Sequence, residues 1–482
     1  MAYIPYPQML DYEALLPATV VGGSSVLALL SDLILPRRFA NGAAMLIGAL
    51  ATILAGFYAY GLYGVNDLHY LAFFGHFVLD GPSVIFQEIV LLATFVTILL
   101  FNRRGEREDR PAYVALVLWS ATGAMIMSGA GSLMTVFLGI EILSLALYCL
   151  CAIQRTSEPA KEAGFKYLIL SSTASGFLLY GMALLFGATG TVQISSLIHP
   201  QSGPHGLYAL GMGIFLIGVA FKLALAPFHI WAPDVYEGAP LPVTAFMSVA
   251  TKAGTLAVLG RVIYTAIPTP EAHWILLPTF VFAAASMLIG NLGALAQTNI
   301  KRLLAYSSVA QAGYIVAAFA GATETGIRSA IYYLGAYAFM NLGAFAVAAL
   351  LSGEREEGTH LVSYEGLAAR RPLLAAAMTF FMLSLAGMPI TAGFLGKIFV
   401  LSSTVRSGYW PLGIMLILGS AISFYVYFKV IRAMFARVER FRHPIVRPPS
   451  QLPWIAVAIC AVAVIVLTFV PVMPGDVVFF VK

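Results

Sequence analysis

Runs of about 20 apolar residues recur from one end of this sequence to the other, and each is long enough to cross the hydrocarbon core of a bilayer. Hydrophobic residues make up 60% of the 482 residues and charged residues only 10%, whereas ordinary soluble domains contain about 25% charged residues. Because backbone groups in lipid must be hydrogen-bonded within their own segment, such runs form helices. The sequence therefore predicts an all-α polytopic membrane protein.

The pattern predicts about 14 transmembrane helices. They cover approximately residues 12–35, 40–63, 77–101, 111–129, 132–153, 161–187, 205–230, 241–266, 273–297, 301–321, 327–351, 372–404, 410–436 and 452–473. The first residues, MAYIPYPQMLDYEALLP, lack the positive region of a cleavable signal peptide, so we expect no such peptide here.

The distribution of basic residues supports this count. With the N-terminus on the outer side, only Arg328, Arg406 and Lys482 fall in outer loops. The inner loops receive 18 basic residues: Arg37, Arg38, Arg103, Arg104, Arg107, Arg110, Arg155, Lys161, Lys301, Arg302, Arg355, Arg370, Arg371, Arg432, Arg437, Arg440, Arg442 and Arg447. This asymmetry follows the positive-inside rule, so we expect both termini on the outer side.

Two predicted spans are interrupted in a similar way. Pro227 follows Lys222 in one span, and a Gly-Pro segment around Pro389 precedes Lys397 in another, five spans later. An odd-numbered unit repeated in tandem must be inverted in the membrane, and paired broken helices in such repeats mark ion pathways. We therefore predict N-terminal helices in 1–110, two inverted five-helix repeats in 111–266 and 267–440, and a final helix in 441–482.

Charged residues inside the predicted spans are the main functional candidates. Lys222, Lys252 and Lys397 lie deep in their spans, where a lysine costs about 3 kcal/mol on the insertion scale. Glu141, in FLGIEILSLALYCL, offers a counter-charge, with Ser144 as its only polar neighbour. Such a cost needs a reason, and the usual reason is a change of protonation.

Cysteine and glycine patterns give no sign of a bound metal or dinucleotide. Cys149, Cys151 and Cys460 all lie in apolar runs without paired spacing or a neighbouring histidine, which favours inert thiols. No G-x-G-x-x-G sequence follows a strand. We therefore expect no cofactor and no metal in this chain.

Four segments together resemble a known family. These are FKLALAPFHIWAPDVYEGAPLPVTAF, LGIEILSLALY, NIKRLLAYSSVAQAGY and GMPITAGFLGK. They resemble the antiporter-like membrane subunits of respiratory complex I, NADH:quinone oxidoreductase, over roughly residues 80–440. The VYEGAP turn and the lysine at position 397 resemble the N type (NuoN in bacteria) most, since the related M type carries a glutamate there.

The resemblance implies roles for particular residues. The residues matched by Glu141 and Lys222 form a charge pair in that family, and the one matched by Lys166 modulates this pair. Those matched by Lys252 and Lys397 continue a polar chain along the membrane midplane.

For two further positions the resemblance does not imply a single role. His229 matches a histidine of the broken helix, where it either takes part in proton transfer or only orients the helix. Gln311 stands in YSSVAQAGY, where many members have a histidine. A titratable relay at this point is therefore in doubt, although an amide with water could pass a proton.

Structural interpretations remain open beside the functional ones. The Lys397 ammonium could satisfy backbone groups freed by the break beside it. Lys166 lies one turn past Glu162, at the i, i+4 spacing of a surface ion pair. The functional case is weaker for four other residues. Glu88 has no evident partner, Lys429 lies near the end of its span, and Asp234 and Glu237 lie in a predicted loop.

The resemblance implies a proton-translocating subunit of an enzyme complex, with FMN, iron–sulfur clusters and quinone in partner subunits. The implied partners are other membrane-arm subunits, including further antiporter-like ones. The expected location is a bacterial inner membrane, with a mitochondrial inner membrane as the alternative. Rival interpretations are a subunit of a multi-subunit Na+/H+ antiporter or of a related hydrogenase, an inert spacer, and a self-contained solute carrier.

Overall fold

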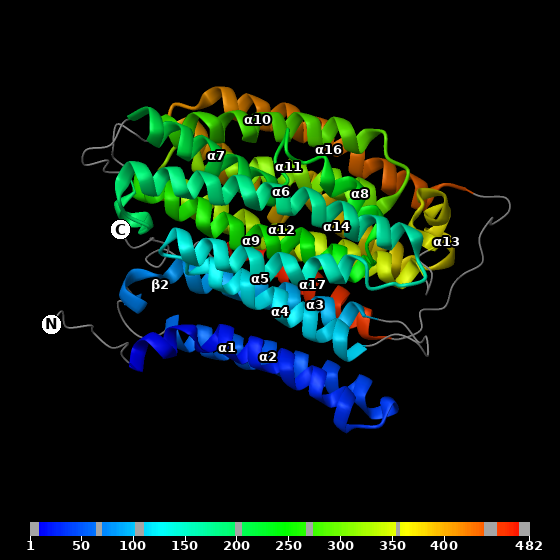
Figure 1. Ribbon diagram of the computed structural model, residues 1–482. Coiled ribbons are helices and arrows are strands. Elements are labelled where there is room, and N and C mark those ends of the chain that lie inside the picture. The colour runs from blue at the N-terminus through cyan, green and yellow to red at the C-terminus, as the bar shows by residue number, and fades with distance from the viewer. Residues whose placement is uncertain are drawn as a thin grey trace.

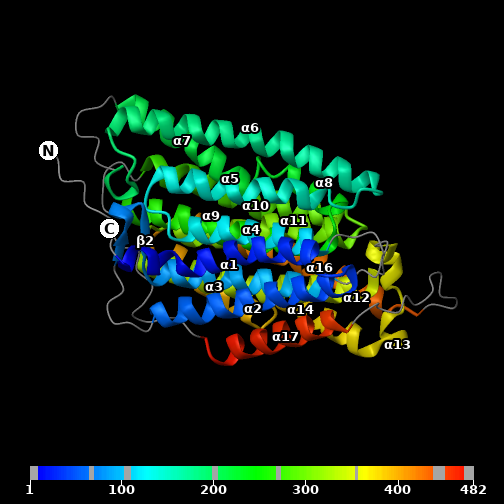
Figure 2. The same ribbon diagram turned by 60° about the horizontal axis from the view of Figure 1, so that its bottom comes forward.

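The protein is a single bundle of helices that run roughly side by side (Figures 1 and 2). The computed structural model describes residues 9–63, 70–101, 110–197, 205–266, 273–352, 357–437 and 451–471. Its helices are α1 (Met9–Ile34), α2 (Arg37–Tyr63), α3 (Gly81–Leu100), α4 (Arg110–Ser128), α5 (Leu133–Cys151), α6 (Glu158–Thr189), α7 (His205–Leu223), α8 (Trp231–Gly238), α9 (Leu241–Ala266), α10 (His273–Leu295), α11 (Ile300–Phe319), α12 (Glu324–Ser352), α13 (Leu367–Arg370), α14 (Pro372–Ala386), α15 (Ala392–Arg406), α16 (Trp410–Phe435) and α17 (Leu452–Phe469). A short hairpin of β1 (Tyr70–Ala72) and β2 (Phe77–Leu79) precedes α3.

The predicted spans agree with these helices. Within the described residues, 12 helices are long and apolar enough to cross a membrane. The two other predicted spans correspond to α11 and to the consecutive helices α14 and α15. Several predicted loop residues lie outside the described part of the chain, as does the end of the last predicted span: Arg103, Arg104, Arg107, Arg355, Arg440, Arg442, Arg447, Lys482 and 472–473.

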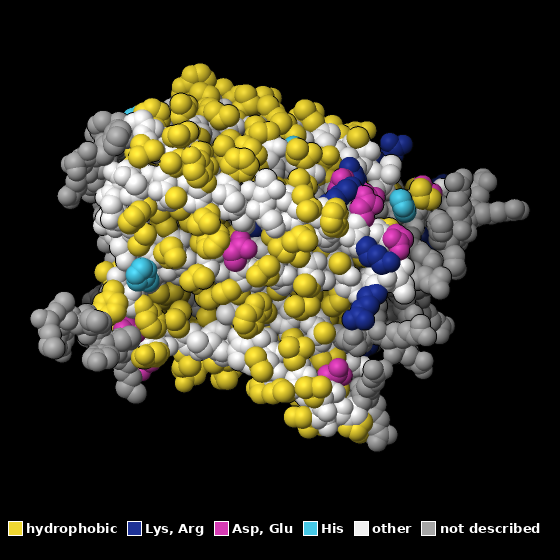
Figure 3. All heavy atoms as spheres, in the orientation of Figure 1, with side chains coloured by type: hydrophobic (Ala, Val, Ile, Leu, Met, Phe, Trp, Pro, Cys, Tyr) yellow, Lys and Arg dark blue, Asp and Glu magenta, His cyan; other side chains and the backbone are white. Residues whose placement is uncertain are grey.

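Charged side chains gather at one end of the bundle, which we call the charged end (Figure 3). Figure 1 places α8 and α13 at this end, whereas α1 begins and α17 ends at the opposite end. The side face between the two ends is covered mainly by apolar side chains (Figure 3). This arrangement is the one expected of a bundle that crosses a membrane with its basic loops on one side.

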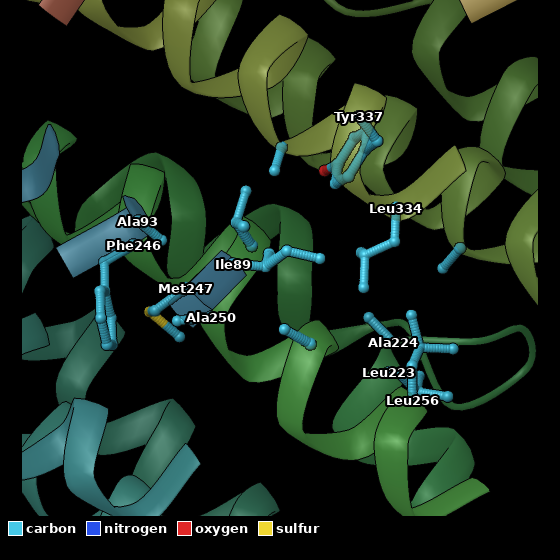
Figure 4. Packing of buried hydrophobic residues seen from close by; sticks show 14 of the residues in the cluster. Ile89, Ala93, Leu223, Ala224, Phe246, Met247, Ala250, Leu256, Leu334 and Tyr337 are labelled. Carbon is cyan, nitrogen blue, oxygen red and sulfur yellow. The ribbon is translucent and has the colours of Figure 1, made fainter. Parts of the chain in front are cut away.

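Helix α9 forms the centre of the bundle. All of its apolar window is buried inside the protein, and it packs against α3, α4, α7 and α12. Figure 4 shows Tyr337 and Leu334 of α12 near Met247 and Ala250 of α9 and Ile89 of α3. A helix that is buried on all sides carries polar residues only at an energetic cost, so the lysine at its middle requires an explanation.

A buried ion pair joins α3 to α9. Arg261 of α9 donates two hydrogen bonds, of 2.8 and 3.1 Å, to the carboxylate of Asp80. The Asp80 side chain also accepts a bond from the Ser83 backbone N–H and so caps α3. Both charged side chains are almost fully buried, 3% and 0% exposed, so each depends on the other for its charge to be tolerated.

Replacement of Arg261 by methionine should destabilise the subunit strongly. The Asp80 carboxylate would stay buried without its partner, which costs about 3–5 kcal/mol. The double variant Asp80→Asn, Arg261→Met should recover more than half of this loss, because no charge is left unpaired and asparagine can still cap α3. Thermal unfolding of the detergent-solubilised complex measures the stability of the single and the double variant. A loss below about 1 kcal/mol for Arg261→Met would show that the pair is dispensable.

Candidate functional site

The first broken helix is α7, which ends at Leu223 in the middle of the bundle. Ala224 has a φ of +54°, which stops the helix, and Pro227 has no N–H to continue it. Neighbouring elements bind the backbone groups that the break exposes. The Trp231 indole donates to the Phe221 carbonyl at 3.0 Å, and the Ala226 N–H donates to the hydroxyl of Ser286 on α10 at 2.8 Å.

The second broken helix is formed by α14 and α15. Helix α14 ends at Ala386, Gly387 follows with a φ of +81°, and Thr391 caps the start of α15. The break was predicted from the Gly-Pro segment and is confirmed. The two breaks therefore each leave the carbonyl end of a half-helix, with its partial negative charge, part-way along the bundle.

A lysine binds the last carbonyl of each of these half-helices. Lys252, on α9, donates from Nζ to the carbonyl oxygen of Leu223 at 3.0 Å. Lys397, on α15, donates to the carbonyl oxygen of Ala386 at 2.9 Å, and its Nζ lies 4.9 Å from the centre of the Tyr314 ring. Both lysines are buried, 1% and 5% exposed. The contact that we considered as a structural role for Lys397 is therefore present.

Lys222 has hydroxyl groups as its partners. Its Nζ donates to Ser144 Oγ on α5 and to Ser171 Oγ on α6, both at 2.7 Å. Ser171 also accepts a bond from Tyr148 at 2.9 Å. Lys222 is 4% exposed, so three helices enclose an ammonium group within a small cluster of hydroxyls.

Among the described residues, Glu141 makes neither an ion pair nor a hydrogen bond with Lys222. Its Oε1 is buried and accepts no hydrogen bond from any residue that the structure describes. The physical reason is the position of Glu141 on α5. It lies in one helical stripe with Met134, Leu138 and Leu145, which are 53–56% exposed, and its side chain is half-buried.

Gln311 connects the second break to three neighbouring helices. Its amide Nε2 donates to the Leu385 carbonyl at 3.2 Å and to the Tyr427 hydroxyl at 3.1 Å. Its Oε1 accepts a bond from the Tyr333 hydroxyl at 2.5 Å, and Tyr427 is bonded in turn to Ser307. Gln311 and Lys397 therefore bind consecutive carbonyls of the same broken helix, those of Leu385 and Ala386.

Lys166 lies at the charged end, apart from the buried lysines. It pairs with Glu162 at 2.7 Å, as its spacing predicted, and with Asp234 of α8 at 3.3 Å. Arg302 of α11 completes this network by binding Asp234 and Glu237, both at 2.8 Å. The structural pairing that we considered for Lys166 is therefore present. Its side chain is 41% exposed, and it is not among the hydrogen-bond partners of Lys222 in the described part of the chain.

The remaining candidates occupy separate places. The His229 ring packs against the Tyr306 ring with centroids 6.2 Å apart, and its Nδ1 has no partner among the described residues. Glu88 of α3 is half-buried beside Gly56 of α2. Lys429 donates to the carbonyl of Leu295, the last residue of α10, at 3.1 Å and to the carbonyl of Gln297 at 2.9 Å. Among the described residues, none of these three side chains is hydrogen-bonded to Lys222, Lys252 or Lys397.

Sequence reasoning did not identify the hydroxyls that hold Lys222, or the pairing of Arg261 with Asp80. Serines within a helix carry no distinctive pattern, and residues 181 positions apart meet only in the fold. One signal was available for Ser144, because it is the only polar residue close to Glu141 in its span. No group of three His, Cys, Asp or Glu side chains within the described segments could hold a metal ion.

Broken helices whose ends meet buried lysines define a class of polytopic membrane proteins that handle ions within the bilayer. Residues 130–423 match the family model described as NADH:quinone oxidoreductase/Mrp antiporter, TM. The chain is 38% identical to NADH-quinone oxidoreductase subunit N 1 of Symbiobacterium thermophilum, over 96% of this chain and 97% of that protein. It is 41% identical to subunit N of Trichlorobacter lovleyi, over 89% and 88% of the two chains.

A solved structure gives the same result. A chain of respiratory complex I from Thermus thermophilus with bound aureothin has a TM-score of 0.81 and is 34% identical, covering 95% of this chain and 98% of that one. The chain belongs to the subunit N family of NADH:quinone oxidoreductase and is an antiporter-like, proton-translocating membrane subunit of complex I. The resemblance in the sequence is thereby confirmed.

Replacement of Gly387 by alanine tests whether proton pumping depends on the contact between Lys397 and the Ala386 carbonyl. An alanine Cβ at this site would lie 2.9 Å from Lys397 Cδ and 3.2 Å from its Nζ, so the lysine must move from the Ala386 carbonyl. The left-handed backbone adds about 1–2 kcal/mol of strain. We expect the proton-pumping stoichiometry of the assembled complex to fall.

Gly408→Ala is the matched control. Gly408 has the same φ of +81°, but nothing lies within 4 Å of its Cβ position. It should lose stability to a similar degree and retain pumping. Equal pumping by the two variants would show that the contact between Lys397 and the broken helix is not required.

Proposed function

We propose that Lys222, Lys252 and Lys397 carry protons through this subunit, with Glu141 controlling the first of them and Gln311 linking the last two. The observation that supports this most directly is the pairing of Lys252 and Lys397 with the last carbonyls of the two interrupted half-helices. A buried ammonium at such a carbonyl is hydrogen-bonded in its charged form yet has no carboxylate partner to keep it charged.

The effect of a nearby carboxylate on a lysine is large enough to move a proton against the membrane potential. Moving one charge against about 150 mV costs roughly 3.5 kcal/mol. A nearby carboxylate changes a lysine pKa by about 1–3, and each unit is worth about 1.4 kcal/mol. Since no hydrogen bond fixes Glu141 to Lys222 among the described residues, a small movement of either side chain would change the distance between the two charges. We propose that this movement drives the release of a proton from Lys222 toward Lys252.

We further propose that residues 111–266 and 267–440 are two inverted repeats. Helix α7 runs from the opposite end of the bundle into its middle, whereas α14 starts next to α13 at the charged end. The two interrupted helices therefore run in opposite directions, as inverted repeats require. Residues 1–110 supply α1–α3 beside the first repeat, and α17, from 441–482, packs against α12 and α3.

The outward stripe of α5 suggests how energy reaches the lysines. A carboxylate among exposed apolar side chains is unfavourable in contact with lipid, so we propose that another membrane-arm subunit, including one of the antiporter-like type, covers Glu141 in the complex. The reduction of quinone, through FMN and iron–sulfur clusters held by partner subunits, would then act on this chain through that contact.

We propose a bacterial inner membrane as the location of this chain. The charged end would face the cytoplasm, because basic loops stay on that side. Both chain termini would then lie on the outer, periplasmic side, because α1 begins and α17 ends at the end of the bundle opposite the charged end. A mitochondrial inner membrane, with the matrix in place of the cytoplasm, is the alternative.

Glu141→Ala and Lys222→Ala should each lose most proton pumping in the assembled complex. An acid–base group in a transfer path contributes about 100-fold or more to the rate of its step. Pumping is measured as acidification per electron pair in membrane vesicles, with the yield of intact complex determined alongside. Lys161→Ala is the control, because Lys161 is half-exposed and pairs only with Glu158 among the described residues. Unaltered stoichiometry in both test variants would defeat the assignment.

Replacement of Gln311 tests the link between Lys252 and Lys397. Gln311→Leu removes its bonds to the Leu385 carbonyl and to two tyrosine hydroxyls, so pumping should fall with electron transfer slowed in parallel. Gln311→His restores a donor and an acceptor and should retain at least half of the parent rate, measured in the same vesicles. Full pumping by Gln311→Leu would show that protons pass without this amide.

A further inference from the structure

The lysine of the second broken helix has an aromatic partner. Lys397 Nζ lies over the ring of Tyr314 on α11, 4.9 Å from the ring centre. Among the described residues, neither Lys222 nor Lys252 lies over an aromatic ring. The face of an aromatic ring carries a partial negative charge and attracts an ammonium group within about 6 Å. Lys397 is therefore held by a contact whose strength depends on its charge.

Oxygen acceptors account for only part of the Lys397 ammonium group. Its Nζ donates to the Ala386 carbonyl at 2.9 Å and, more weakly, to Ser423 Oγ at 3.4 Å. An ammonium has three N–H groups, and the described residues offer this one no third oxygen and no carboxylate. Within the described part of the chain, the ring of Tyr314 is therefore the remaining group that attracts its charge.

Two neighbouring helices hold the Tyr314 ring in place. The side chain is fully buried, and its hydroxyl accepts a bond of 2.8 Å from the Asn291 amide of α10. The same amide nitrogen donates to the Met287 carbonyl at 2.6 Å, so the asparagine cannot rotate without losing a bond. On α16, a Cβ added at Gly419 would lie 2.8 Å from the Tyr314 oxygen and 3.2 Å from the Asn291 nitrogen. The glycine at this position therefore leaves room for the bonded pair.

We propose that Tyr314 is a positioning residue for Lys397, whose ammonium form its ring binds beside the Ala386 carbonyl. Asn291 and Gly419 fix the ring at that place. A neutral amine can still donate a hydrogen bond to the carbonyl, but it loses the attraction of the ring, because that attraction requires the charge. The ring thus distinguishes the protonated lysine from the neutral one. This inference rests on the proposed role of Lys397 in proton transfer.

The first test changes the charge of the ring face and keeps the size of the ring. Tyr314→Phe keeps the ring and should retain at least half of the parent rate of proton pumping per assembled complex in vesicles driven by NADH. Phenylalanine with one, two or three fluorine atoms at this position withdraws electron density from the face in steps. Pumping should fall in steps too, by about tenfold over the series, as expected for the loss of a desolvated cation–π contact. A flat series would show that the ring only fills space and would overturn the proposal.

Tyr364 is the matched control for the fluorinated series. Its side chain is fully buried, as that of Tyr314 is, but no cation of the described residues lies over its ring. The same fluorinated residues at position 364 should leave pumping unchanged. An equal loss at both positions would be a general effect of fluorination in a buried site and would likewise overturn the proposal.

The second test displaces the ring by a substitution on another helix. Gly419→Ala places a methyl group against the Tyr314 hydroxyl, so the ring must shift relative to Lys397, and pumping should fall by about tenfold. The double variant Gly419→Ala, Tyr314→Phe has no hydroxyl at that point and should recover at least half of the Tyr314→Phe rate. Gly335→Ala on α12 is the control, because nothing lies within 4 Å of its Cβ position, and it should pump normally. Unchanged pumping by Gly419→Ala, or a loss that Tyr314→Phe does not relieve, would overturn the proposal.

The positioning role of Tyr314 and the proposed function fail in different ways. If Lys222→Ala loses pumping while the fluorinated series at position 314 is flat, Tyr314 has no positioning role and the proposed function stands. If Lys222→Ala and the whole fluorinated series pump normally, the proposed function fails as well.

Discussion

The hydrogen bond between a lysine and the last carbonyl of a half-helix is the interaction on which the centre of this subunit depends. An uninterrupted helix satisfies all its own carbonyls and offers nothing to a cation in lipid. The breaks after Leu223 and Ala386 change this, because each leaves a carbonyl and the negative end of a helix dipole inside the bundle. A bond from a charged donor is worth about 1.5–3 kcal/mol, and the dipole adds up to about 2 kcal/mol. Together they offset the roughly 3 kcal/mol that burying a lysine costs.

Lysines outside the relay that we propose make the same kind of contact. Lys301 donates to the Ala239 carbonyl that ends α8, and Lys429 donates to the Leu295 carbonyl that ends α10. A helix C-terminus is thus a general place for a lysine in this bundle, and burial against a carbonyl does not by itself indicate transport. Lys252 and Lys397 differ because the half-helices whose carbonyls they bind, α7 and α14, end in the middle of the bundle. In the relay that we propose, a proton released there would pass to another buried group.

Much of this arrangement could be predicted from the sequence, and the rest could not for identifiable reasons. The apolar runs located the helices, and Pro227 and the Gly-Pro segment after Leu385 located both breaks, because these residues act on the backbone locally. The i, i+4 spacing also predicted the pairing of Glu162 with Lys166. Contacts between distant segments were not predictable. The partner of Arg261, the serines that hold Lys222 and the carbonyls bound by Gln311 depend on how the helices pack, and no local pattern encodes that.

The three buried lysines are not equivalent, and this difference would give the relay that we propose a direction. Lys222 is held by two hydroxyls, and we propose that a neighbouring subunit acts on it through Glu141 on the outward face of α5. Lys252 and Lys397 are held by backbone carbonyls, whose positions are fixed by the fold and cannot respond to a partner in the same way. In the relay that we propose, a change at Glu141 would act on Lys222 first, and Lys252 and Lys397 would accept the proton in turn. Because only Lys222 would be adjustable in this proposal, one contact with a neighbouring subunit would be enough to move a proton along the whole relay.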